Sequence, residues 1–147
     1  MSLSIQFDGL DELQADLARA SDETRKGVAR EITRTALAIN ADVKKRIQRG
    51  PKTGRTYRKS ETVTHTASAP GQAPATDTGF LASSPYYEQS SPLSATVGSR
   101  LAYAYFLEFG TRTIAARPSW VPAIEAERPK FDARVDAILR SAFDDRR

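Results

Sequence analysis

The chain has 147 residues, of which 39% are hydrophobic and 27% charged, and its formal net charge is +4. Such a composition is that of an ordinary soluble protein, so we expect residues 1–147 to form a single domain with one modest core. The sequence contains no cysteine, which excludes disulfides, thiolate metal sites and a cysteine nucleophile. It also lacks a signal-type N-terminus and any run of about 18 apolar residues, so we expect a cytoplasmic protein that does not contact a membrane.

A long helical pattern follows a short N-terminal strand. Apolar residues alternate with polar ones in residues 3–7, which predicts the strand. They then recur at three- and four-residue spacing over residues 10–17 and 28–47. Ser21 and its neighbour Asp22 offer a break or a new cap, so both one long helix and two nearly collinear helices fit the pattern. The apolar stripe of so long a helix must lie on a sheet or on a neighbouring subunit.

Residues 51–78 are expected to form an arm outside the core. They are rich in Pro, Gly, Ser, Thr and basic residues and carry few large apolar side chains. Residues 54–59 and 61–65 favour the two strands of an extended hairpin, because both are rich in β-compatible residues. A loop this long is usually either functional or disordered. A segment that is disordered alone and becomes ordered only against a partner fits both descriptions.

The second half of the chain predicts a hairpin from residues 80–88 and 93–99, joined by a Ser-Ser-Pro turn. Residues 101–109 favour a short helix that ends at a glycine, and residues 112–117 predict a strand. Proline residues then introduce a C-terminal helix whose apolar pattern runs over residues 121–139. The expected fold class is α+β, with a long N-terminal helix and a C-terminal helix packed on a small antiparallel sheet and a long flexible or hairpin arm.

No group of residues indicates catalysis or metal binding. The one histidine, His65, lies in the arm, where we expect it to be solvated and without a positioned partner. The carboxylates are scattered along helix faces without metal-ligand spacing, and no phosphate-binding glycine motif occurs. We therefore expect a protein that is not an enzyme and that uses no cofactor and no metal.

Glu108 is a charged residue within an aromatic run, so its carboxylate must reach solvent or pair with a base. Within the fold Glu108 is expected to be a helix-end acceptor or to form an ion pair, and a role in a subunit contact is the alternative. Arg112 and Arg117 are the candidate bases, and a Glu108–Arg117 clamp is the preferred polar arrangement. The aromatic residues around Glu108 are expected mainly in the core, with one left over for an interface. These residues are Tyr103, Tyr105, Phe106 and Phe109.

Basic residues are concentrated in one part of the chain. Between Ser21 and Ser60 there are twelve Lys or Arg against four Asp or Glu. This stretch could bind phosphate or an acidic protein surface, or it could be a solvated helix face followed by a basic loop. It is accompanied by no helix-turn-helix pattern and by no aromatic platform beyond Tyr57. A small basic nucleic-acid-binding protein is therefore an alternative function.

Three sequence blocks, taken in order, resemble one protein family. They are residues 68–81, with the motif Pro-Gly-x-x-Pro-Ala-x-Asp-Thr-Gly, residues 103–111, with Glu-Phe-Gly-Thr, and residues 116–123. They are similar to the minor tail component, or tail-completion and head-tail connector, family of long-tailed bacteriophages and prophages. The opening residues 7–13 also match this family. Many members have a basic residue where this chain has Phe80 and an aromatic one where it has Ser119.

The resemblance implies an α+β subunit of a homo-oligomeric ring at the neck or the end of the tail. The implied partners are tail-tube proteins, head-connector proteins and the DNA in the lumen. It implies assembly in the host cytoplasm and a final place in the virion. In such a subunit, glycines would permit the turns and prolines would stiffen them, and Trp120 and Phe109 would anchor the packing. The candidate assembly and interface residues are Arg55, Tyr57, Arg58, Lys59, Asp77, Gly79, Glu108, Phe109, Gly110, Arg117 and Trp120.

Overall fold

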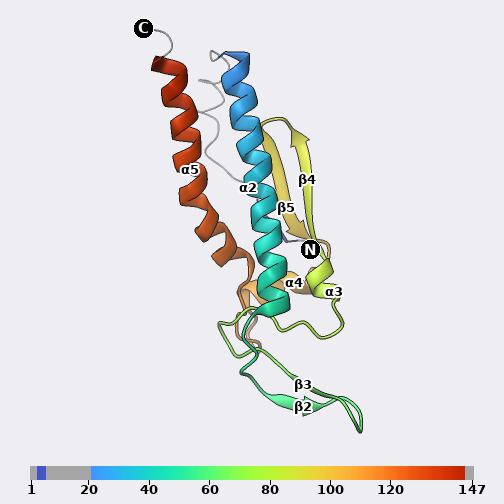
Figure 1. Ribbon diagram of the computed structural model, residues 1–147. Coiled ribbons are helices and arrows are strands. Elements are labelled where there is room, and N and C mark those ends of the chain that lie inside the picture. The colour runs from blue at the N-terminus through green and yellow to red at the C-terminus, as the bar shows by residue number, and fades with distance from the viewer. Residues whose placement is uncertain (1–2, 6–20, 145–147) are drawn as a thin grey trace.

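A computed structural model describes residues 3–5 and 21–144 of the chain (Figure 1). Its elements are helices and short antiparallel strands, which confirms the expected α+β class. The helical pattern predicted over residues 10–17 and the end of the first predicted strand lie outside the described residues.

Helix α2, Asp22–Arg49, is the central element of the fold. Ser21 is its N-cap, and the Ser21 hydroxyl accepts a hydrogen bond from the Thr24 amide at 3.3 Å, as the Ser-Asp signal predicts. Asp22 and Glu23 in the first turn complement the positive end of the helix dipole. One stripe of the helix is buried by the sheet and by the C-terminal helix and consists of Val28, Ala36, Ile39, Val43 and Ile47.

The main sheet has three antiparallel strands in the order β1, β5, β4. Strand β1 is Leu3–Ile5, β4 is Pro85–Ser91 and β5 is Ser94–Ser99, so the predicted strand and hairpin are confirmed. The beginning of the hairpin differs from the prediction, because Phe80–Ser83 is the one-turn helix α3. Gly79 precedes α3 with a φ of +83°, and this left-handed turn starts a helix where a strand was predicted.

Two further helices complete the body, α4, Ala102–Phe109, and α5, Trp120–Asp144. Figure 1 shows α5 beside α2, on the side away from the sheet. Arg134 of α5 holds the two helices together, because its Nε lies 2.6 Å from a carboxylate oxygen of Glu31 and its Nη2 donates to the Thr35 hydroxyl at 3.1 Å. Trp120, which is 2% exposed, joins the core that α2 and β5 form.

The strand predicted over residues 112–117 is wrong. The Thr111 hydroxyl accepts hydrogen bonds from the amides of Thr113 and Ile114, and the Thr111 amide donates to the Ile114 carbonyl. These local bonds close a turn, and local bonding by a Thr side chain competes with strand pairing. The Arg117 amide then donates to the Leu107 carbonyl, which returns the chain to α4.

The arm is a second, two-stranded antiparallel sheet made of β2, Thr56–Arg58, and β3, Thr64–Thr66. The predicted hairpin is confirmed, although its strands are shorter than expected. Figure 1 shows it projecting from the body beyond the C-terminal end of α2. At its base the Gly54 amide donates to the Ala67 carbonyl and the Ala67 amide to the Arg55 carbonyl.

Gly110 ends α4 with a φ of +75°, and a Cβ placed there would lie 2.7 Å from the Ile114 carbonyl oxygen and 2.9 Å from the Ala116 nitrogen. Gly71 has a similar φ of +80°, but its Cβ would meet nothing within 4 Å. We expect Gly71→Ala to cost about 1 kcal/mol from backbone strain alone and Gly110→Ala about 3 kcal/mol from strain plus steric conflict. Chemical denaturation of both variants measures the difference, and equal losses would contradict this account of the turn.

Candidate functional site

Asp77 connects the arm to the body. Lys59, directly after β2, places its Nζ 2.6 Å from both carboxylate oxygens of Asp77. His65 of β3 approaches the same carboxylate through Nδ1 at 3.5 Å. The two strands of the arm therefore converge on one acidic residue of the Asp-Thr-Gly turn.

His65 is not the solvated loop residue that the sequence predicts. Its side chain is only 13% exposed, and its ring packs against Tyr57 with 5.4 Å between ring centroids. The hairpin register explains this, because Tyr57 and His65 are directly paired across the two strands. The sequence places these residues in an arm but does not indicate that the arm contacts Asp77.

The hydrogen bond from Lys59 lowers the pKa of the Asp77 carboxyl below its ordinary value of 3.8, and the charges of Lys59 and His65 act in the same direction. A lowered pKa in the folded state means that the contact contributes fully above pH 3.8 and is lost as the pH falls through the lowered value. The bond between Lys59 and Asp77 should therefore not change between about pH 5 and 7.

Asp77→Asn should release the arm from the body, because the neutral amide keeps the shape of the side chain but loses its charge-assisted bond to Lys59. We expect the protection of the amides in β2 and β3 from hydrogen exchange to fall severalfold, with no change in α2. Glu88→Gln is the control, since it removes an exposed carboxylate of β4 that does not contact the arm. Equal protection in wild type and Asp77→Asn would show that Asp77 does not hold the arm.

Glu108 does not pair with Arg117, so the predicted clamp is wrong. Its carboxylate, 3% exposed, accepts hydrogen bonds from the backbone amides at the start of α5. The shortest bonds are 2.7 Å from Ser119, 3.0 Å from Trp120 and 2.7 Å from Val121. These amides are the unpaired donors at the positive end of a helix, and a carboxylate satisfies several of them at once. Glu108 thus caps α5 from α4.

Glu108→Ala should destabilise the fold by about 3 kcal/mol, because it leaves buried amide groups without an acceptor. Glu108→Gln should lose less, since one acceptor oxygen remains. Trp120 is the only tryptophan and lies at this contact, so denaturant unfolding followed by its fluorescence reports both losses. Glu125→Ala, an exposed carboxylate on α5, is the control, and a loss in Glu108→Ala no larger than in this control would contradict the capping role.

The aromatic residues of α4 are exposed rather than buried. Their exposed fractions are 45% for Tyr103, 38% for Tyr105, 43% for Phe106 and 53% for Phe109, so Phe109 does not anchor the core. Small Ala104 and the capping Glu108 are the buried residues of the helix. Because α4 uses this polar contact to attach, its aromatic side chains remain on the surface. We call these four residues the α4 aromatic face.

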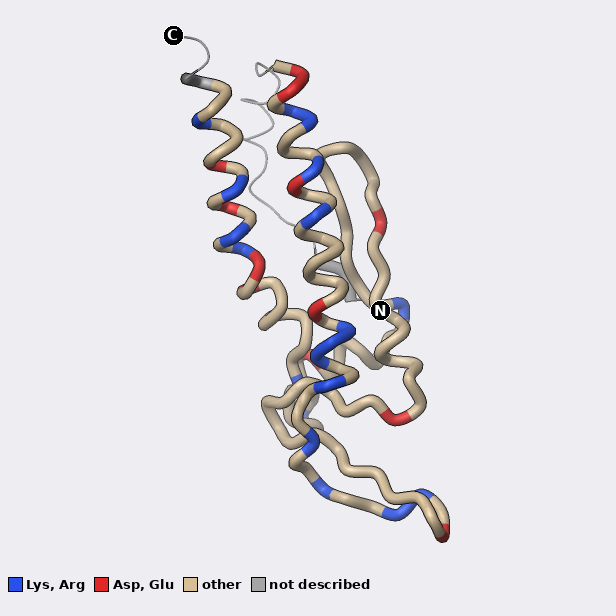
Figure 2. The backbone as a smooth tube through the Cα atoms, viewed as in Figure 1, with Lys and Arg blue, Asp and Glu red and all other residues tan. Residues whose placement is uncertain are grey.

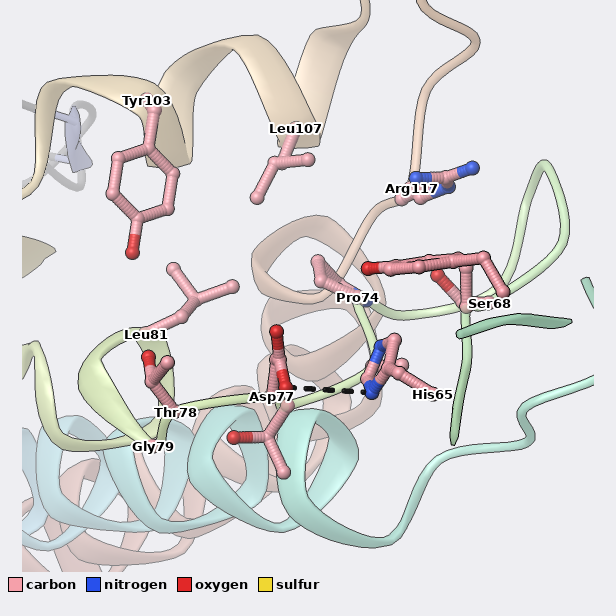
Figure 3. Close-up of a pocket in the computed structure, with 14 residues that line it drawn as sticks. His65, Ser68, Pro74, Asp77, Thr78, Gly79, Leu81, Tyr103, Leu107 and Arg117 are labelled. Atoms are coloured by element: carbon pink, nitrogen blue, oxygen red, sulfur yellow. Dashed lines mark ion pairs between the residues drawn. The ribbon is translucent and has the colours of Figure 1, made fainter. Parts of the chain in front are cut away.

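A cavity of about 240 Å³ lies between the base of the arm, the Asp-Thr-Gly turn and α4. Figure 3 shows Arg117 at one end of it, Tyr103 and Leu81 at the other, and His65 and Asp77 along one side. We call it the Arg117 cavity. Of the candidate interface residues, Tyr57, Asp77, Gly79 and Arg117 line it. Tyr103 and Leu107 also line it, and both belong to the sequence block 103–111, although neither was among the candidate interface residues.

The remaining candidate residues lie outside this cavity. Lys59 bonds to Asp77, whereas Arg55 and Arg58 are exposed on the arm. Figure 2 shows that Lys and Arg gather at the C-terminal end of α2 and along the arm. Within residues 3–5 and 21–144 there is no group of three His, Asp or Glu side chains that could hold a metal ion. No helix in this part of the chain is long and apolar enough to cross a bilayer.

These features define a small α+β protein with surfaces suited to contact with other proteins. Residues 11–110 match the family described as "Bacteriophage HK97-gp10, putative tail-component". The match covers more than half of the chain, so the protein belongs to this HK97 gp10-like family of phage tail components, in agreement with the resemblance of its sequence motifs. Comparison with curated proteins and with solved structures gave no significant match.

Proposed function

We propose that this phage tail component is a structural subunit of a homo-oligomeric ring at the neck or tail end, where it completes the tail and joins it to the head. The α4 aromatic face carries the proposal. Fully burying one large apolar side chain is worth about 1.5–3 kcal/mol, so each half-exposed ring would gain roughly 1 kcal/mol by burial against another protein. Exposed aromatic clusters are typical of protein interfaces.

A ring with head-to-tail contacts requires two different surfaces on each subunit. The α4 aromatic face offers one of them. The arm offers the other, because it projects from the body and carries exposed side chains, among them Tyr57, Arg58 and Val63. Both surfaces lie at the end of the molecule where α2 terminates. A subunit can therefore contact one neighbour through the α4 aromatic face and the other neighbour through the arm.

The proposed partners are other copies of the chain, the tail-tube protein and the head-connector protein. The exposed basic residues at the end of α2 and on the arm would face the DNA in the lumen or an acidic partner ring. Assembly would take place in the host cytoplasm, and the subunit would end in the virion. The role is structural and not enzymatic, which agrees with membership of a tail-component family.

Sedimentation equilibrium of the full chain tests the ring. We expect wild type to form one closed oligomer at high concentration, and Phe109→Ser to weaken each subunit contact about fivefold because it removes exposed apolar area worth roughly 1 kcal/mol. Leu37→Ser is the matched control, since Leu37 is 50% exposed on α2 and Phe109 is 53% exposed on α4. Unfolding followed by Trp120 fluorescence verifies that both variants remain folded.

Two results would contradict the proposal. The first is association that Phe109→Ser leaves unchanged or that Leu37→Ser weakens equally. The second is a stable monomer that binds duplex DNA with an affinity that falls steeply with salt, as expected for a small basic nucleic-acid-binding protein.

A further inference from the structure

Arg117 lines the Arg117 cavity and forms no ion pair with any described residue. Its Nε is buried and has no hydrogen-bond partner among the residues the structure describes, and no described carboxylate lies within ion-pair distance. The hydroxyl of Thr76, on the same cavity wall, is also buried and without a partner. Buried polar groups in folded proteins are almost always satisfied by protein or by ordered water, so these two atoms indicate where a polar group of another molecule can bind.

The chemistry of the cavity selects an acceptor with negative charge. A guanidinium can only donate hydrogen bonds, and the hydroxyl groups of Tyr57, Ser68, Thr76 and Tyr103 on the wall can also donate. The carboxylate of Asp77 is the one anion on the wall, and Lys59 contacts both of its oxygens at 2.6 Å. A carboxylate matches this set of donors and pairs with a guanidinium in a bidentate way.

The arm itself carries a suitable carboxylate. Glu61 is the only acidic residue in residues 51–66, it lies near the tip of the hairpin, and it is exposed. It has no hydrogen bond or ion pair to any described residue. Val63, two residues further on, is 51% exposed and apolar. The tip therefore combines one free carboxylate with one apolar side chain.

The cavity offers the complement of that tip. Tyr103 belongs both to the cavity wall and to the α4 aromatic face, so an apolar surface borders the site of positive charge. Glu61 and Arg117 of the same chain form no ion pair, and Lys59 and His65 bind the arm to Asp77 instead. Five residues of extended strand between base and tip span roughly 17 Å, which gives the arm reach towards a second copy.

We propose that the Arg117 cavity binds the Glu61 carboxylate of a neighbouring copy, with Val63 of that copy on the α4 aromatic face. The contact is head-to-tail, since each copy gives its arm tip to one neighbour and receives a tip from the other. Such contacts form a ring when the rotation between copies closes. The assignment of the carboxylate to Glu61 rests on the proposed ring function, whereas the preference of the cavity for a carboxylate does not.

The cavity is tested first, on dilute protein, by titration with N-acetylglutamate amide and with N-acetylglutamine amide as the neutral control. At constant ionic strength we expect the first probe to give saturable shifts in ¹H–¹⁵N spectra at the Arg117 Nε–H and the Thr76 amide, and the second to give none. Arg117→Gln should abolish the shift of Thr76. Equal shifts with both probes, or no saturation, would overturn the carboxylate site. Tighter binding of inorganic phosphate would overturn its assignment to a protein carboxylate.

The occupant is tested by charge reversal. Glu61→Arg alone and Arg117→Glu alone should each weaken self-association at least tenfold, because each places like charges together. Mixing the two single variants should restore association, since every contact in an alternating assembly then joins opposite charges. Glu88→Arg is the control for added charge, as Glu88 is exposed on β4. Trp120 fluorescence verifies that each variant is folded.

The possible failures are distinguishable. Association of Glu61→Arg at the wild-type strength, or no restoration on mixing, would overturn Glu61 as the occupant. A wild type that never associates would overturn the ring and with it the occupant, but the titration with the glutamate probe would still decide the cavity.

Discussion

The arrangement of α4, the arm and the Arg117 cavity depends on the hydrogen bonds between the buried Glu108 carboxylate and the start of α5. Glu108 of α4 accepts the first amides of α5, and this contact fixes a short helix to the long C-terminal one. A helix of eight residues is not stable through its own propensity. Because the polar contact does the anchoring, α4 does not need to bury its large side chains, and they remain available to another protein.

Contacts at the base of the arm and at Asp77 hold the arm in its extended position. The base of the arm is closed by backbone bonds between the segments before β2 and after β3, and the side chains of Lys59 and His65 attach the arm to Asp77. The Asp-Thr-Gly turn is in turn linked to α2, since the Thr76 amide donates to the Ile47 carbonyl at the end of that helix. The Asp-Thr-Gly turn thus connects the arm and the wall of the Arg117 cavity to the C-terminal end of α2.

Local sequence patterns predicted the elements whose causes are local. The stripe of α2, the Ser21 cap and the β4–β5 hairpin follow from residue spacing and turn chemistry within a few positions. Glu108 was assigned the wrong partner because a buried carboxylate can be satisfied equally well by a guanidinium or by backbone amides eleven to thirteen residues away. Hydrophobicity likewise could not show that the aromatic residues of α4 are exposed, since burial depends on how the helix is attached.

The hairpin tip has a consequence for how related chains can diverge. Hydrogen bonds from the Lys59 and Ser60 amides to the Val63 carbonyl close the tip. None of residues 59–63, which connect β2 to β3, belongs to the hydrophobic core. Insertions at such a tip leave the packing of the body unchanged, and each doubling of loop length costs only about 0.6 kcal/mol in closure entropy. Length and sequence of the tip can therefore vary while the scaffold stays constant, which allows subunits of one architecture to evolve different neighbours.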